Sequence, residues 1–447
     1  MKQITAYFRT VTPLFLGGAE NTLEAELRPA AIKGALRFWW RTLQWGKGIQ
    51  DAACLKKKED TLFGSSEVIK SKDSAGKTIF QGGQARFLLM VESQCQPVEI
   101  KKGDVLSRIG DRAVHSSTNP NAIVGDGARY LGYGLMAAFP TRDKLTKKVI
   151  KKAGQLDRPC FAAPFEFTVR LIFRNSVADG DVFKEVADAL KLLGLCGGIG
   201  SRSRRGWGSL TLTKLEENET EIWAAPKTFD EFKSKIEETT GSQKSGAAGL
   251  LPEWTAFAAG HSRIVLLQDG IHSPLETLDQ MGRDFVFFRS WGKNGKVLNK
   301  PSEKNFQFDH DLFRKIQPRD RQTEHPQRIT FGLPHNYGKN VQDQVIPANN
   351  DLTRRASPLF FHVHQASADN LPIGVLTYLP ARFLPERQDK VKFGGPPVEL
   401  AHDGVGDFWK PVENFLDRVM GADGKHPVTP PLTPSQVTFE QTMEVTL

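Results

Sequence analysis

The chain of 447 residues contains only four cysteines, and no two of them form a CxxC pair. Zinc ribbons and disulfide frameworks need closely spaced cysteines, so this spacing argues against both. We expect the four thiols to be buried and reduced, as is usual in a reducing compartment. They are Cys54, Cys95, Cys160 and Cys196.

Long apolar runs are also missing. No stretch approaches the ~18 apolar residues that a membrane span needs, and the amino-terminal MKQITAYFRT has no apolar core of a signal peptide. We therefore expect a soluble, cytoplasmic protein that does not bind membranes. Tyrosine is scarce, with 5 residues, whereas the 29 phenylalanines suit a sheet-rich interior. The net charge of +9 favours a polyanionic partner, but the clustering of the cations matters more than their excess.

The first half predicts the element order strand, helix, strands, helix, glycine loop, strand. This order is typical of a split βαβ or ferredoxin-like domain. Asp181 is the expected cap of the second helix, and the lysine-rich segment 56–78 is expected to be an exposed loop. The strands are expected over 3–16, 85–93, 128–139, 163–173 and 207–215, and the helices over 29–46 and 179–198.

The second half predicts another α+β domain. A polar, glycine-rich segment over 216–249 marks the boundary, so the length and pattern favour domains 1–217 and 218–447. A proline-rich tail lies over 426–436. Strands are expected over 263–268, 357–366 and 371–380, and helices over 274–292, 308–317 and 407–420.

The stretch GLCGGIGSRSRRGWGSL, residues 194–210, predicts a loop that lies against a nucleic-acid backbone. Glycines permit a close approach of backbone to ligand, arginines match phosphate geometry, and a tryptophan ring can stack on a base. A Walker A loop is excluded because no GK[ST] follows the glycines, and a dinucleotide fingerprint would need the reverse order of strand and helix. The candidate residues are Gly197, Gly198, Gly200, Arg202, Arg204, Arg205 and Trp207.

The helix over 29–46 carries a basic stripe beside its apolar face. Lys33, Arg37 and Arg41 follow one another at helical spacing, and no acidic residue of this helix interrupts them. This array predicts phosphate contacts. The neighbouring Trp39 and Trp40 are expected to be core residues.

Further candidates lie in the second half. Arg289 and Trp291, in FRSWG, could contact backbone and base, and Arg354 and Arg355 come just before a predicted strand. His362 and His364 could share a metal, but a HxH pair without a third ligand is more often structural. Asp309, in FDHD, is explained by helix capping. His115 is a weak candidate for the general base of a ribonuclease. We expect no catalytic residue, metal or cofactor.

The stretch GLCGGIGSRSRRGWGSL closely resembles the glycine-rich loop of the RAMP superfamily of CRISPR proteins. The stretches RPAAIKGALRFWWRTLQWG, LFGSSE and RRASPLFFHVH resemble the motifs of one subfamily, the first RAMP subunit of the Cmr complex, which is the type III-B CRISPR effector. The resemblance spans both halves, from Arg28 to about His364. It implies an α+β fold of two tandem ferredoxin-like (RRM-like) RAMP domains with antiparallel sheets, a glycine-rich loop and insertions.

The resemblance further implies a non-catalytic subunit of an RNA-guided ribonucleoprotein of antiviral defence. Such a subunit is expected to bind single-stranded crRNA towards its 3′ end, or target RNA, and to touch other RAMP subunits, with no DNA as primary ligand. The basic helix, the loop arginines and the pair Arg354 and Arg355 match basic motifs of the family. The length, the lysine-rich insertion near residues 47–60 and the stretch after residue 400 depart from it. A RAMP-type metal-independent endoribonuclease that processes CRISPR transcripts, and a protein-only scaffold, remain the alternatives.

Overall fold

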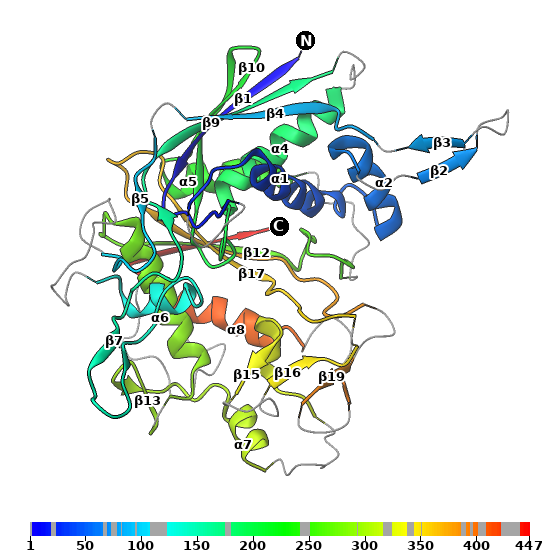
Figure 1. Ribbon diagram of the computed structural model, residues 1–447. Helices are drawn as coiled ribbons and strands as arrows, with labels where there is room; N and C mark the ends of the chain where they lie inside the picture. The colour runs from blue at the N-terminus through cyan, green and yellow to red at the C-terminus, as the bar shows by residue number, and fades with distance from the viewer. Residues whose placement is uncertain are drawn as a thin grey trace.

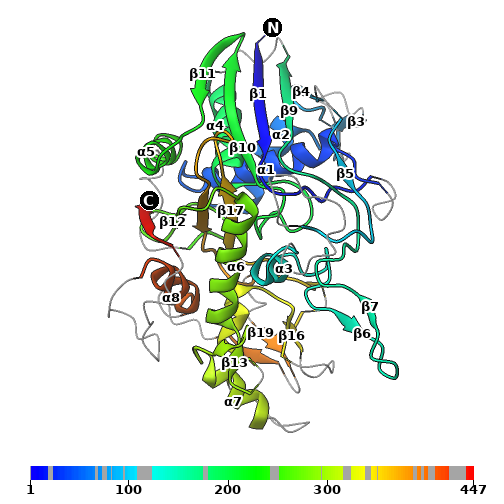
Figure 2. The same ribbon diagram turned by 90° about the vertical axis from the view of Figure 1, so that its left-hand side faces the viewer.

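A computed structural model describes most of the chain (Figures 1 and 2). The described ranges are 2–18, 24–65, 69–72, 78–81, 83–93, 96–107, 123–174, 180–241, 251–292, 294–315, 324–337, 344–349, 351–385, 390–393, 397–400, 408–421 and 439–447. His115, Cys95 and the proline-rich tail lie outside them.

The first half is built on a five-stranded antiparallel sheet with the order β11-β10-β1-β9-β4. Two helices, α1 (Pro29–Gln44) and α4 (Gly180–Cys196), pack against one another below this sheet (Figure 1). Without the edge strand β11, the chain order is β-α-β-β-α-β, which is the connectivity of a split βαβ unit. The strands are β1 (Gln3–Thr10), β4 (Phe87–Glu92), β9 (Glu166–Phe173), β10 (Leu210–Glu217) and β11 (Thr220–Ala224).

The second half repeats this connectivity. Its antiparallel sheet has the order β17-β18-β12-β21, and α6 (Pro274–Arg289) and α8 (Lys410–Val419) follow its first and third strands. Numbered along the chain, the main strands have the order 4-1-3-2 in both sheets. The strands are β12 (Arg263–Gln268), β17 (Leu359–His364), β18 (Ile373–Tyr378) and β21 (Gln441–Thr446).

The two halves share their hydrophobic cores, so the layers follow one another as sheet, helices, sheet, helices. One face of the second sheet, including Leu266 and Val375, belongs to the core that contains α1 and α4. The other face, including Leu267 and Leu376, packs with residues of α6 and α8. This explains why every residue of β17 and β18 is buried: both faces of this antiparallel sheet are covered, which removes the usual alternation with polar residues.

Two hydroxyl groups join the sheets directly. The backbone amide of Val363 donates to the Oγ of Ser209 at 3.1 Å, and the amide of Gln365 donates to the Oγ1 of Thr211 at 3.1 Å. These bonds satisfy a buried amide of β17 and the buried amide that follows this strand, at the place where β10 passes it. The glycine-rich loop, which leads into β10, is therefore fixed against both halves.

Shorter helices and strands surround these two sheets and their helices. They are α2 (Ala52–Phe63), β2 (Ile69–Lys72), β3 (Thr78–Gln81), β5 (Glu99–Ile100), α3 (Asp126–Leu131), β6 (Thr141–Arg142), β7 (Val149–Lys151), β8 (Cys160–Phe161), α5 (Phe229–Thr240), β13 (Lys296–Val297), β14 (Lys300–Pro301), α7 (Gln307–Lys315), the 3-10 helix η3 (Gln327–Phe331), β15 (His335–Asn336), β16 (Gln344–Pro347), β19 (Lys390–Lys392) and β20 (Val398–Glu399).

Several expectations need correction. The predicted strand over 128–139 begins as helix α3, and part of the predicted lysine-rich loop is helix α2. Asp181 lies inside the first turn of α4 rather than before it. The first sheet continues through β11, beyond the predicted boundary at residue 217. Cys160 and Cys196 are buried thiols as expected, but Cys54 is exposed.

In the described part of the chain, no helix is long and apolar enough to cross a membrane. The same ranges hold no group of three or more His, Cys, Asp or Glu side chains that could bind a metal ion. His362 and His364 are both buried in β17, and burial lowers the pKa of each.

The contact between α3 and α6 depends on two glycines, which provides a test of the packing. A Cβ on Gly282 would lie 2.3 Å from backbone atoms of Gly127. We expect Gly282→Ala to lower the free energy of unfolding by about 1–3 kcal/mol, as overpacking does. Gly34 of α1 has no neighbouring atom within 4 Å, so Gly34→Ala should instead raise that free energy by about 0.5–1 kcal/mol. Urea unfolding of both variants checks this, and equal stability of Gly282→Ala and the wild type would refute the contact.

Candidate nucleic-acid interface

A cleft of about 990 Å³ opens between α1 and α2 of the first half and the segments 352–355 and 382–385 of the second half. Seven cations and three carboxylates line it, so the charge of the cleft is positive. Five of the fourteen residues predicted from the sequence meet here, although they come from three separate segments. The cations are Arg37, Arg41, Lys56, Arg204, Arg354, Arg355 and Arg382, and the carboxylates are Glu59, Asp60 and Glu253.

Helix α1 presents its basic stripe to this cleft, but acidic residues of α2 face it. The Nε of Arg37 donates to Glu59 at 2.6 Å, and the Nη1 of Arg41 lies 3.5 Å from the same carboxylate. Lys33 lies outside the cleft lining, and burial together with repulsion by Arg37 lowers its pKa. The basic stripe therefore exists, but carboxylates of α2 partly neutralise it. The sequence predicted a loop where most of α2 lies.

The glycines of the loop serve the packing of the chain against itself. A Cβ on Gly197 would lie 2.4 Å from the Nε1 of Trp39, and a Cβ on Gly198 would lie 2.5 Å from the carbonyl oxygen of Gly208. Gly200 has φ = +87° and approaches the carbonyl oxygen of Phe15. The three glycines also line a smaller cavity of about 200 Å³ beside Arg204. A ligand role for them stays a prediction.

Arg204 reaches the cleft from the loop. Its guanidinium lies 4.6 Å from the ring centre of Phe360 and 4.9 Å from that of Phe38, and its Nη1 donates to the carbonyl of Ser357 at 3.0 Å. Burial lowers the pKa of Arg204 to about 10, and the charges of Arg355 and Arg41 add to this shift. An arginine stays protonated at neutral pH, so the lowered pKa records the cost of a charge without a carboxylate.

The second half contributes an exposed and a partly buried arginine. Arg354 is exposed and, in the described ranges, pairs with no carboxylate. The Nε of Arg355 donates to the carbonyl of Phe383 at 2.7 Å, and burial lowers the pKa of Arg355 to about 10. Backbone carbonyls thus hold Arg355 in place without neutralising it, as they do for Arg204.

Arg205 and Trp207 point away from the cleft. The guanidinium of Arg205 lies 4.9 Å from the ring centre of Phe285, and burial lowers its pKa to about 9. Trp207 is fully buried and meets Phe15 edge to face at 5.5 Å. Its ring is a core element in this structure, which corrects the expectation that it could stack on a base. Arg205 therefore packs the loop against the second half and does not contribute to the cleft.

Arg202 lies on the other side of the loop. It has φ = +63°, its Nε donates to the carbonyl of Tyr133 at 2.8 Å, and its side chain is not part of the cleft. The three loop arginines therefore point to three different places. They are therefore not arranged to bind one phosphate together, as a single phosphate-binding loop would require.

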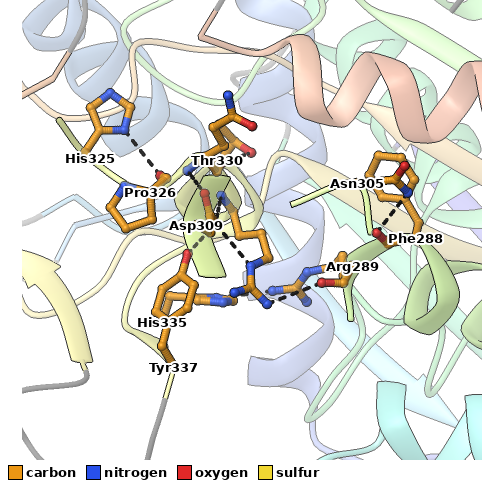
Figure 3. Close-up of polar contacts among 11 residues, drawn as sticks. Phe288, Arg289, Asn305, Asp309, His325, Pro326, Thr330, His335 and Tyr337 are labelled. Atoms are coloured by element: carbon orange, nitrogen blue, oxygen red, sulfur yellow. Dashed lines mark hydrogen bonds and ion pairs between the residues drawn. The ribbon is translucent and has the colours of Figure 1, made fainter. Parts of the chain in front are cut away.

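Arg289 and Trp291 do not line the cleft either. Figure 3 shows Arg289 beside His335, where its Nη2 donates to Nδ1 at 3.2 Å. In the same cluster, the hydroxyl of Tyr337 donates to Asp309 at 2.8 Å. Burial lowers the pKa of His335 well below its usual value. Trp291 stacks on His310, with ring centres 4.2 Å apart.

Asp309 fixes this cluster rather than capping its own helix. Its carboxylate accepts hydrogen bonds from the backbone amides of Gln327 and Arg328 at 2.7 and 3.0 Å. These are the first amides of η3. Asp309 therefore caps a helix, as predicted, but the helix is η3 and not its own helix α7.

Residues 7–211 match the family model of the RAMP superfamily. This part of the chain is similar to the RAMP superfamily. It includes α1, α4 and the glycine-rich loop, so the expected RAMP resemblance is confirmed.

Individual RAMP relatives are more distant. The chain is 27% identical to the CRISPR system Cmr subunit Cmr1-2 of Pyrococcus furiosus over 209 residues, which are 46% of this chain and 93% of that protein. It is similar to the crystal structure of Cmr1 from Pyrococcus furiosus in its apo form, at 18% identity and a TM-score of 0.47, over 92% of this chain and 96% of that one. It is also similar to a chain of the type III-B Cmr-beta bound to cognate target RNA, at 14% identity and a TM-score of 0.42, over 93% and 99%.

Three further contributors to the cleft were not predicted from the sequence. Lys56 was placed in a loop, and Arg382 was not singled out. Trp254 is partly buried, and its Nε1 donates to the carbonyl of Arg41 at 3.1 Å. No pattern around Trp254 separates it from an ordinary core residue, because its position depends on the packing of the second half against α1.

The arrangement predicts that the cleft binds phosphate. We expect tripolyphosphate, at a hundredfold excess over its Kd, to stabilise the folded protein by about 2–3 kcal/mol, measured as a rise in Tm. The rise should be smaller in Arg204→Ala and in Arg355→Ala, because each change removes a cation that no carboxylate neutralises. Arg202→Ala changes the same loop outside the cleft and should keep the full rise. Equal shifts in Arg202→Ala and Arg204→Ala would contradict a phosphate site in the cleft.

Proposed function

We propose that this chain is a non-catalytic RNA-binding subunit of a type III-B CRISPR (Cmr) effector complex, composed of two tandem ferredoxin-like RAMP domains. Its ligand is single-stranded crRNA towards the 3′ end, target RNA, or both. The RAMP match over 7–211 supports the family, and the similarity to a Cmr subunit supports the complex. The repeated β-α-β-β-α-β connectivity supports the two domains, with their boundary after β11.

One observation carries the RNA-binding role. Seven cations from both halves converge on one cleft that has only three carboxylates. Arg204 and Arg355 are held there by backbone carbonyls, so their charges remain available. Arginines of this kind bind phosphate bidentately, and the ring of Phe38 at the same wall could support a base.

The runner-up function, a metal-independent endoribonuclease, needs a general base that can reach a 2′-hydroxyl. None of the histidines with described positions lines the cleft. His335 does lie beside Arg289, but it is held within a packed cluster of Tyr337 and Arg328 (Figure 3). His115 lies outside the residues that the structure describes. Incubation of the purified protein with repeat RNA, without metal, separates the two functions, because the proposed subunit leaves the RNA intact.

RNA binding by the cleft predicts a specific salt dependence. We expect Arg354→Ala to weaken binding of single-stranded RNA at every sequence, since it removes a phosphate contact and no base contact. The slope of log K against log salt should flatten by about 0.7, as measured by fluorescence anisotropy. Arg142→Ala removes an exposed arginine outside the cleft and should leave the slope unchanged. An unaltered slope in Arg354→Ala would reject the cleft as the RNA site.

A separate surface supports contact with other subunits of the complex. The hairpin of β6 and β7 projects beyond α3 (Figure 2) and, in Figure 1, lies on the opposite side of the molecule from α2. Leu145 at its tip is 92% exposed, and Ile150 is 65% exposed. Apolar side chains gathered on an exposed hairpin are typical of a protein-binding surface. The lysines beside them, among them Lys144 and Lys148, favour an acidic partner surface.

Loss of these apolar side chains should weaken assembly without affecting RNA binding. We expect Leu145→Ser together with Ile150→Ser to reduce capture of the other Cmr subunits by at least about tenfold, as truncation of two interface anchors does. Co-purification with co-expressed subunits measures this, and anisotropy with RNA is the control. Undiminished capture would show that partner subunits dock elsewhere.

A further inference from the structure

Helix α2 brings a carboxylate to the place where the proposed function needs an anion. Glu59 is buried, and its two oxygens face two arginines of α1: Oε1 accepts from the Nε of Arg37 at 2.6 Å, and Oε2 lies 3.5 Å from the Nη1 of Arg41. A carboxylate that bridges two guanidinium groups makes the same kind of charge-assisted contacts as a phosphate. The two arginines are therefore already occupied in the free protein.

The sequence of α2 explains how Glu59 reaches this position. The helix begins at a cap in which Asp51 accepts a hydrogen bond from the amide of Cys54 at 2.7 Å. Leu62 and Phe63 are buried in the core that contains α1. This anchoring turns Glu59 towards the cleft. The next residue, Asp60, lies 3.8 Å from Arg37 and forms an ion pair with Lys56 at 2.8 Å.

We propose that Glu59 is an internal competitor of RNA: it holds Arg37 and Arg41 in the free protein, and a phosphate of the RNA backbone must displace it to engage them. This inference rests on the proposed RNA-binding function. Its consequence is selectivity. A short or poorly placed strand gains little by displacing a carboxylate, whereas a strand that also reaches Arg204 and Arg354 gains enough contacts to do so.

The alternative role for Glu59 is to orient the two arginines for RNA, and the two roles predict opposite signs. Glu59→Gln keeps the size of the side chain and an oxygen that can accept from Arg37, but it removes the negative charge. If Glu59 competes, this change strengthens RNA binding. If Glu59 only orients, the change weakens binding or leaves it the same.

The experiment measures binding of a fluorescein-labelled single-stranded oligouridine by the full chain over a series of salt concentrations. We expect Glu59→Gln to tighten binding roughly two- to fivefold at low salt, the range expected for one partly exposed ion pair. The slope of log K against log salt should steepen, because in the wild type the displaced carboxylate takes up a cation and offsets part of the counterion release from the RNA. In a background of Arg37→Ala and Arg41→Ala, the same substitution should give no gain.

Glu253→Gln is the matched control, since Glu253 lines the same cleft, is exposed and contacts no cation among the described residues. It should change affinity much less than Glu59→Gln. Equal gains in affinity in both variants would mean that only the total charge of the cleft matters. A loss of affinity in Glu59→Gln with unchanged Tm would mean that Glu59 orients the two arginines for RNA. Either result overturns the proposal. Failure of the wild type to bind the oligouridine would instead reject the proposed function.

Discussion

The structure depends on arginine side chains that are buried among aromatic rings and carbonyl oxygens without a carboxylate beside them. Arg204 lies between Phe38 of the first half and Phe360 of the second, and Arg205 follows with Phe285 and Phe361. Burial lowers the pKa of both. A cation held in this way contributes packing and hydrogen bonds, but its charge remains unbalanced. The glycine-rich loop therefore connects the two halves through its arginines and is also a source of positive potential.

The fold creates this situation through its layers. Helix α4 lies between the two sheets, and the loop that leaves it must turn back into β10 beside β17. Glycines allow the turn where the loop approaches Trp39 and Phe15. Because the loop lies at the contact between the halves, side chains from α1, α2 and the segment before β17 meet around Arg204, and the cleft forms there. Residues that are far apart in the sequence thus become one surface.

The sequence predicted the main strands and helices well, because their apolar periodicity is clear and the packing of α1 and α6 follows it. It did not predict α2, whose run of lysines resembles a loop, or α3, whose aromatic residues resemble a strand. For the site, charge alone identified Arg37, Arg41, Arg204, Arg354 and Arg355. Charge could not separate them from Arg205 and Arg289, and the sequence could not show that the ring of Trp207 is buried, because burial is a property of the tertiary structure. Glu59 escaped notice for the same reason: only the packing of α2 on α1 brings it to Arg37.

The most direct test of this account is a photo-crosslinking map of the protein bound to single-stranded RNA that carries 4-thiouridine. Crosslinked peptides identified by mass spectrometry should contain Phe38, Trp254 or the segment 352–355, since these line the cleft from both halves. Crosslinks confined to the outer face of the first sheet, for example at Tyr7, or to Tyr133 beside Arg202, would contradict the claim that the unbalanced arginines of the cleft hold the RNA.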